Sequence, residues 1–238
     1  MKGVFYGIGV GPGDPDLLTL KAVKILQKVD VIIAPRTEKK EGSIALSIAG
    51  NYIREDTRIL ELAFPMVFDR SFLTEAWEQN KTVILDLLHE GKNVAFLTLG
   101  DPMLYSTYIY IYRLLEGNGI TIETVPGITS FCAAASRLNF PLAEGNDILS
   151  IVPAILEEDK ISTALSYSDN VVLMKVYKNY EQVVTQLKKH GLDGEAVMIS
   201  RCGFEDEEIT HSLEGRESKM PNYLSTVLAK KRSNGQPK

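Results

Sequence analysis

An uncharged run that stops at a glycine constrains the fold of this chain more than any other feature. Residues 94–99 (Val-Ala-Phe-Leu-Thr-Leu) read as a buried strand, typical of parallel sheets covered on both faces. Gly100 permits unusual backbone angles and Pro102 cannot donate to a ladder, so the chain leaves the sheet here. Open α/β sheets bind ligands at the carboxyl edge of their strands. We therefore predict a ligand-contacting loop from Gly100 to Ser106, with an ordinary turn as the alternative.

A second strand-like run, residues 4–10, leads into a turn rich in glycine and proline (Gly-Pro-Gly-Asp-Pro, residues 11–15). The glycine spacing superficially resembles a dinucleotide fingerprint, which needs a glycine-rich turn that opens directly into a helix. Pro12 and Pro15 interrupt the turn, and the strand predicted over 29–34 does not end on an acidic residue for a ribose. These departures disfavour a nucleotide-binding oxidoreductase.

A third segment of the same kind follows a β-rich run at residues 120–125. Pro126 and Gly127 form a tight turn, which opens into a helix of small residues (Cys-Ala-Ala-Ala, residues 132–135). Small side chains leave room for a ligand to lie close to the backbone. The sequence thus contains three strand-to-loop segments of similar design.

Together these segments resemble the tetrapyrrole methylase family, the methyltransferases of corrin and sirohaem synthesis. The matching stretches are Gly9-Val10-Gly11-Pro12-Gly13-Asp14-Pro15 with Leu17-Leu18-Thr19, Gly100-Asp101-Pro102, and Val125-Pro126-Gly127-Ile128-Thr129-Ser130. Segments 32–36, 43–45 and 221–225 look most like the branch that methylates C-20 of precorrin-2 or cobalt-precorrin-2. The resemblance covers essentially the whole chain and is strongest through residue 137.

The resemblance implies an α/β fold of two α/β domains with a ligand trough between them. Alternating strand and helix patterns agree with this, and the runs 208–213 and 223–229 predict antiparallel pairing, hence a mixed sheet in the second domain. Residues 116–119 (Glu-Gly-Asn-Gly) are the best candidate hinge. We expect an N-terminal domain at 1–117 and a C-terminal domain at 118–238.

The resemblance also implies S-adenosylmethionine as the cofactor. Carried over by motif, its contacts fall on the loop after residue 99 and at the start of the small-residue helix: Gly100, Asp101, Met103, Leu104, Tyr105, Thr129 and Ser130. Later strand ends supply further expected contacts: Met174, Lys175, Arg201, Cys202, Tyr223 and Leu224. For Met174 and Lys175 the alternatives are core packing and a solvated strand end.

Transfer of a sulfonium methyl to an electron-rich carbon demands alignment and exclusion of water more than acid–base chemistry. Residues that could accept the proton left on C-20 are Asp101, Tyr105 and Tyr108, although the tyrosines also fit a packed helix face. We expect the substrate to lie against Gly11, Pro12, Gly13 and Asp14. Its carboxylates need cations, and the candidates are Arg36, Lys39, Lys40 and Arg137, of which Arg36 leads because it ends a strand.

Composition excludes several other classes of protein. The net charge of −5 argues against a nucleic-acid surface, and no run approaches the length of a membrane helix. The start of the chain reads as a strand and not a signal peptide, so we expect a cytoplasmic protein. Two cysteines without a Cys-x-x-Cys pair suggest neither disulfides nor a structural zinc site. The family resemblance further implies a homodimer, and the apolar segment 64–68 is the candidate interface.

Alternative functions stay open at this stage. One is a tetrapyrrole methylase that acts on uroporphyrinogen or on a different corrin carbon. Others are the oxidoreductase and a non-catalytic module that binds tetrapyrrole without methyl transfer. The sequence does not show whether the acceptor carries cobalt.

Overall fold

The computed structural model describes residues 2–36, 42–64, 70–214 and 220–231, and within them the side chains of all but residues 36 and 70–74. The chain divides into two compact units, Met1–Thr129 and Ser130–Lys238, here called the N-terminal and C-terminal units. No helix in the described ranges has the length and apolar character that crossing a membrane requires.

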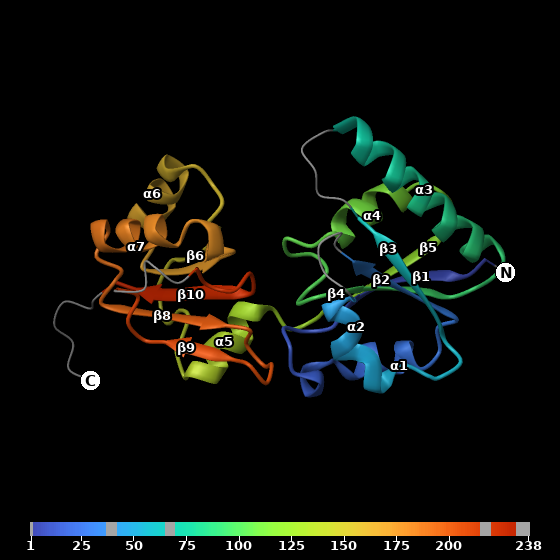
Figure 1. Cartoon of the computed structure of the whole chain (residues 1–238), viewed down its shortest axis with the longest axis horizontal. Helices are drawn as coiled ribbons and strands as arrows, with labels where there is room; N and C mark the ends of the chain where they lie inside the picture. Colours follow the sequence, from blue (N-terminus) through green and yellow to red (C-terminus); the bar gives the residue numbers. More distant parts are fainter. Residues whose placement is uncertain (1, 37–41, 65–69, 215–219, 232–238) are drawn as a thin grey trace. The chain divides into compact units, whose positions relative to one another are not determined.

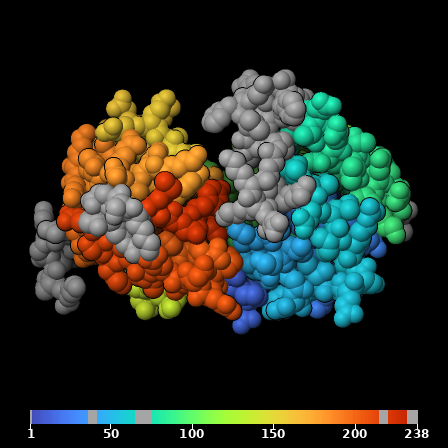
Figure 2. Space-filling view, viewed as in Figure 1, coloured from blue at the N-terminus to red at the C-terminus, as the bar shows by residue number. Residues whose placement is uncertain are grey.

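The N-terminal unit is built on a parallel sheet of five strands in the order β3-β2-β4-β1-β5. The strands are β1 (Val4–Gly9), β2 (Val31–Arg36), β3 (Arg58–Ala63), β4 (Val94–Thr98) and β5 (Thr121–Val125). Every residue of β4 is buried, as its uncharged sequence predicts for a central strand. The edge strand β3 is largely exposed or half-buried, and with α2 and α3 it forms much of this unit's surface in Figure 2.

Helices cover both faces of this sheet (Figure 1). One face carries α1 (Leu20–Leu26) and α2 (Ile44–Ala49), with short 3-10 turns at Pro15–Leu17 and Gly50–Tyr52; the other carries α3 (Arg70–His89) and α4 (Tyr108–Leu115). Thr19 caps α1, since its hydroxyl accepts from the Ala22 amide. Beneath α3 and α4, the buried side chains include Phe5, Phe96 and Tyr108. The predicted parallel α/β architecture is confirmed.

The C-terminal unit holds a mixed sheet in the order β6-β7-β10-β8-β9. Its elements are α5 (Ser130–Leu138), β6 (Leu149–Pro153), α6 (Glu158–Ser166), β7 (Asn170–Met174), a 3-10 turn (Val176–Lys178), α7 (Tyr180–Lys189), β8 (Glu195–Ser200), β9 (Glu208–Thr210) and β10 (Ser225–Lys230). Strand β10 runs antiparallel to both β7 and β8, and β9 pairs antiparallel with β8. The predicted mixed sheet is confirmed, but β9 and β10 pair with β8 and not with each other.

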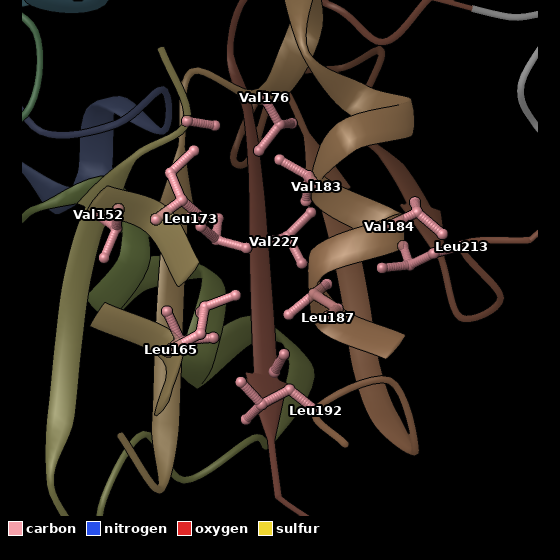
Figure 3. Packing of buried hydrophobic residues seen from close by; sticks show 14 of the residues in the cluster. Val152, Leu165, Leu173, Val176, Val183, Val184, Leu187, Leu192, Leu213 and Val227 are labelled. Carbon is pink, nitrogen blue, oxygen red and sulfur yellow. The ribbon is translucent and has the colours of Figure 1, made fainter. Parts of the chain in front are cut away.

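The core of this unit lies between the sheet and helices α6 and α7. Figure 3 shows Val183 and Leu187 of α7 directed toward Val227 of β10, with Leu165 of α6 beside the same sheet face. All four side chains are fully buried. Helix α5 packs on the opposite face, against β10. Burial on both faces explains why β10 is apolar in its central residues.

The division between the units lies after Thr129, twelve residues beyond the expected boundary at 117/118. The reason is that β5 pairs in parallel with β1, from Val4 opposite Thr121 to Ile8 opposite Val125. Residues 116–119 are therefore the connection from α4 into β5, inside the N-terminal unit. A glycine-rich turn marks a change of direction, but only long-range pairing shows which sheet the next strand joins.

Candidate functional site

The connections of the N-terminal sheet diverge between β1 and β4. From β1 the chain crosses through α1 toward β2 on one side, and from β4 it crosses through α4 to β5 on the other side and face. Such a reversal of strand order leaves a crevice outside the carboxyl ends of the two strands, where open α/β sheets bind ligands. The loops that follow β1 and β4 flank this point, and they are the two loops that the sequence predicted to contact a ligand.

The backbones of these two loops are joined directly. The Gly100 amide donates to the Gly11 carbonyl at 2.8 Å, and the Gly11 amide donates back to Gly100 at 3.3 Å. Both glycines have left-handed backbones, with φ of 77° at Gly11 and 71° at Gly100. This conformation is strained for other residues, which explains glycine at both positions. The paired turns fix the first two loops relative to each other.

The loop after β5 packs against the same turns through glycine. A Cβ built on Gly9 would lie 2.6 Å from the Gly100 carbonyl oxygen, and one built on Gly127 would overlap that oxygen and the Gly9 backbone. Three strand ends therefore meet backbone to backbone at Gly9, Gly100 and Gly127. Gly9 and Gly127 are not among the site residues predicted from the sequence. The signal that marks them is a glycine at the end of one strand and a glycine just after another.

Asp101 holds the second and third loops together. Its Oδ2 accepts from the Gly127 amide at 3.1 Å, and its Oδ1 accepts from the Met103 amide at 2.9 Å. Both carboxylate oxygens are thus engaged by backbone amides. Asp101 therefore shapes the loop, a role other than the proton acceptor that the sequence predicts.

The rest of this loop presents side chains at the surface. Met103 and Tyr105 are exposed, and Leu104 is half-buried. Tyr105 has a left-handed backbone with φ of 49°, which is unusual for a residue other than glycine. The loop then returns into the fold through Ser106, whose buried hydroxyl lies 2.7 Å from that of Thr98. Of the predicted proton acceptors, Tyr105 alone has an exposed side chain.

Thr129 carries an observation that bears on a ligand. Its Oγ1 is buried and, within the described part of the chain, has no hydrogen-bonding partner. Such atoms are rare in folded proteins and call for an explanation. Thr129 follows the Gly127 turn, and Ser130, also predicted to contact the cofactor, begins α5. An unpartnered hydroxyl beside a loop that exposes Met103 and Tyr105 fits a nucleoside cofactor, which offers both donors and acceptors.

Tyr108, the first residue of α4, is fully buried between that helix and the sheet, a position that suits the packing role better than the catalytic one. Its ring lies where a side chain on Gly7 would stand, and its hydroxyl lies 2.7 Å from Thr124 Oγ1. Burial raises the pKa of the phenol, with the Thr124 hydrogen bond acting in the opposite direction. The residue therefore packs in the core and stays protonated. This is the packed helix face that the sequence offered as the alternative for the tyrosines.

Replacing Tyr108 with phenylalanine tests this assignment. The variant keeps the ring but loses the hydroxyl that pairs with Thr124, so we expect a stability loss of about 1 kcal/mol. In a chain of this length the melting temperature falls by about 2–4 °C for such a change. Methyl transfer should proceed at the parent rate once the variant is folded. A large fall in kcat, with the fold intact by circular dichroism, would return Tyr108 to the catalytic set.

The residues predicted to lie against the substrate form the turn after β1. Gly11, Pro12 and Gly13 are buried, and Asp14 accepts from the Asp16 amide at 2.9 Å and so caps the 3-10 turn.

The candidate cations for the substrate carboxylates are only partly described. The side chain of Arg36 and all of Lys39 and Lys40 lie outside the described residues. Arg137 donates from Nε to Glu207 at 2.8 Å. No group of three or more His, Cys, Asp or Glu within the described residues is placed to hold a metal ion.

The remaining predicted contacts gather at one edge of the C-terminal sheet. Met174 and Lys175 end β7, Arg201 and Cys202 follow β8, and Tyr223 and Leu224 precede β10. Because β10 runs antiparallel between β7 and β8, its start lies level with the ends of both neighbours. The Arg201 amide donates to the Leu224 carbonyl at 2.9 Å. Tyr223 lies edge-on to Tyr177, with ring centroids 5.2 Å apart, and Cys202 is buried.

Comparison with known proteins gives a consistent picture. The sequence profile of the Tetrapyrrole (Corrin/Porphyrin) Methylases matches residues 4–216. The cobalt-precorrin-2 C(20)-methyltransferase of Salmonella typhimurium is 36% identical over 232 residues, which are 97% of this chain and 98% of that protein. A probable cobalt-precorrin-2 C(20)-methyltransferase of Methanocaldococcus jannaschii is 37% identical, with 95% of each chain covered.

A solved structure shows the same fold. The X-ray structure of a cobalt precorrin-4 methyltransferase superimposes with a TM-score of 0.76 at 24% identity, over 95% of this chain and 94% of that one. At this identity the match concerns the arrangement of strands and helices.

Proposed function

Because the chain belongs to the tetrapyrrole (corrin/porphyrin) methylase family, we propose that it is an S-adenosylmethionine-dependent methyltransferase that methylates C-20 of cobalt-precorrin-2 or precorrin-2 in cobalamin biosynthesis. Two relatives named for this activity match along nearly their whole length, the second named as probable. Matches of this extent support the same reaction more strongly than they support methylation of uroporphyrinogen or of another corrin carbon.

The observation that carries the proposal is the junction of three loops at Gly9, Gly100 and Gly127. Their backbones are in contact and Asp101 ties them, so the polar backbone groups at this edge are held before a ligand arrives. A preorganised site loses less conformational entropy on binding. We propose that the cofactor binds here, against the loop from Gly100 to Tyr105 and the hydroxyl of Thr129.

S-adenosylmethionine supplies a methyl group on a sulfonium, which a nucleophilic carbon can take without prior activation. The chain's own residues have to hold the reacting carbon, methyl and sulfur in line and to exclude water. The fixed turns at Gly11 and Gly100 provide the rigidity that this alignment needs. Tyr105 is the remaining candidate for accepting the C-20 proton, since Asp101 is bound to backbone amides and Tyr108 is buried.

Turnover with defined acceptors tests the proposal. The purified chain, S-adenosylmethionine and either precorrin-2 or its cobalt form should give a product heavier by one methyl group, detected by mass spectrometry. Thermal shift provides a cheaper discrimination: S-adenosylhomocysteine should raise the melting temperature and NAD should not, because only a ligand of the folded state stabilises it. A response to NAD alone would favour the oxidoreductase. Tetrapyrrole binding without any methyl transfer would favour the non-catalytic module.

Three features stay predictions within this proposal. The homodimer is implied by the family resemblance, and the cytoplasmic location is expected from the strand-like start of the sequence. The proposed interface segment 64–68 lies outside the described residues apart from Phe64, which is buried. Arg36 remains a predicted contact for a substrate carboxylate on the strength of its position as the last residue of β2.

A further inference from the structure

Lys175 and Arg201 share an unusual backbone conformation at one edge of the C-terminal sheet. Lys175 has φ of 60° and directly follows β7, and Arg201 has φ of 53° and directly follows β8. Left-handed backbone is unfavourable for residues with a Cβ, and glycine relieves the strain. Retention of a long side chain at such a position indicates that the side chain is needed.

Asn139 shows what an ordinary left-handed residue looks like in the same unit. Its φ is 49° and it ends helix α5. The Phe140 amide donates to the Ala135 carbonyl at 2.9 Å and the Asn139 amide to Ser136 at 3.3 Å, the bond pair of a Schellman cap, where asparagine is common. Lys175 and Arg201 follow strands, so a C-terminal helix cap does not account for them; Lys175 precedes the 3-10 turn at Val176–Lys178, but its side chain makes no capping hydrogen bond there.

The two cations stand at the same level of the sheet. Met174 pairs with Thr226 of β10, and Ser200 pairs with Ser225. The residues that follow, Lys175 and Arg201, therefore flank the start of β10 from its two sides. Two strand spacings separate their backbones, or about 10 Å. Long side chains that start this far apart can contact the same ligand, either at one group or at two neighbouring groups.

The side chain of Arg201 is held in place before any ligand binds. Its guanidinium lies over the Phe204 ring, 4.4 Å from the centroid, and its Nε donates to Asp206. Asp206 is ionised over a wide pH range, because the hydrogen bond from Arg201 lowers the pKa of its carboxyl. The Arg201 side chain stays 25% exposed. The guanidinium has further N–H donors beyond Nε, so a fixed donor group remains for an external carboxylate.

Lys175 complements this arrangement. Its side chain is half-buried, and burial lowers the pKa of its ammonium. A cation partly withdrawn from water gains more from an incoming carboxylate than a fully solvated one does. The edge thus combines a fixed guanidinium with an ammonium in a less polar setting.

We propose that Lys175 and Arg201 recognise carboxylates of the tetrapyrrole acceptor rather than the cofactor, a proposal that rests on the methyltransferase function proposed above. S-adenosylmethionine carries a sulfonium and an ammonium against one carboxylate, so its net charge is positive. Asp206 balances the charge of Arg201, and what remains for a ligand is the Lys175 ammonium and the free N–H donors of the Arg201 guanidinium, which suit carboxylates better than a net cation. The acceptor is a polycarboxylate and is attracted by the same pair. The family resemblance alone places these residues on the cofactor; their charge assigns them to the acceptor.

Glycine replacements test the proposal, with Asn139→Gly as the matched control. All three changes remove backbone strain, and Asn139→Gly should melt near the parent temperature. Arg201→Gly also removes the contacts with Asp206 and Phe204, so its melting temperature is measured and its binding is compared only once the variant is folded. For Lys175→Gly and Arg201→Gly we expect the acceptor KM to rise by about tenfold or more, while the affinity for S-adenosylhomocysteine stays within about twofold of the parent. Asn139→Gly should leave both constants unchanged. Lys175→Arg, which keeps the charge, should recover most of the acceptor affinity that Lys175→Met loses.

Two results would overturn the proposal. One is an unchanged acceptor KM in both glycine variants; the other is a loss of S-adenosylhomocysteine affinity as large as the loss for the acceptor, which would return the residues to the cofactor. If either glycine variant fails to fold by circular dichroism, Lys175→Met and Arg201→Met, which keep an unbranched stem, are judged by the same criteria. If the parent transfers no methyl group, the proposed function fails. The cation pair is then judged by binding of uroporphyrin, a stable tetrapyrrole polycarboxylate, and equal affinity in parent and variants overturns it.

Discussion

Gly100→Leu is expected to reduce the affinity for S-adenosylhomocysteine by about 100-fold or more while the chain still folds. Among the described residues, a Cβ at Gly100 meets no atom closer than the Ile128 carbonyl oxygen at 4.0 Å, so the first carbon of the added side chain fits without a clash. The side chain occupies the volume that we assign to the cofactor. Isothermal titration measures the affinity directly.

The matched control for this variant is Gly117→Leu. Gly117 also has a left-handed backbone, with φ of 82°, and no atom of the described residues lies within 4 Å of its Cβ position. Both variants therefore carry a similar backbone strain of about 1–2 kcal/mol. Only Gly100 belongs to the proposed site. Equal affinities in Gly100→Leu and the parent would remove the loop after β4 from cofactor binding, whereas equal losses in both variants would show an effect of strain alone.

Gly127→Ala is expected to separate the three loops. A Cβ at this position overlaps the Gly100 carbonyl oxygen and lies 2.8 Å from the Gly9 Cα, so rigid backbone has to move. Overpacking of this kind costs about 1–3 kcal/mol. We expect a fall in melting temperature of about 2–4 °C for each kcal/mol, and a loss of S-adenosylhomocysteine affinity of about tenfold or more as the loops shift.

Gly50→Ala is the matched control for Gly127→Ala. It separates the effect of steric crowding by the new Cβ from the effect of replacing a glycine. Neither Gly50 nor Gly127 has a left-handed backbone, so alanine suits the conformation at both. In the part of the chain that the structure describes, nothing lies within 4 Å of the Cβ position at Gly50, so that variant should melt at or slightly above the parent temperature. Parent-like melting and binding by Gly127→Ala would show that the close packing of the three loops is not needed for the site.

The sequence predicted most elements of the fold because the signals are local. The buried run that became β4 contains no charged residue, and glycine and proline mark its end. The alternation of strands with helices predicted a parallel sheet in the first half of the chain, and the structure confirms it. The boundary of the N-terminal unit was wrong because the pairing of β5 with β1 joins residues far apart in the sequence.

The site was less predictable, since the roles of its residues depend on contacts between loops. Asp101 reads as a candidate base from its position alone, and only the meeting of the loops after β4 and β5 shows that Gly127 and Met103 engage its two oxygens. From the sequence, Tyr108 fits either a packed or a functional helix face. In the structure its ring fills the space that a side chain on Gly7 would occupy, which indicates packing. The left-handed backbones of Lys175 and Arg201 leave no trace in local sequence.

The most direct test of the account is the position of the transferred methyl group. The chain is incubated with S-adenosylmethionine labelled with carbon-13 in its methyl group and with cobalt-precorrin-2 or precorrin-2, and the product is analysed by carbon NMR. We predict a single labelled methyl group bonded to C-20. A labelled methyl on any other carbon of the macrocycle, or no labelled product from either acceptor, would contradict the proposed function.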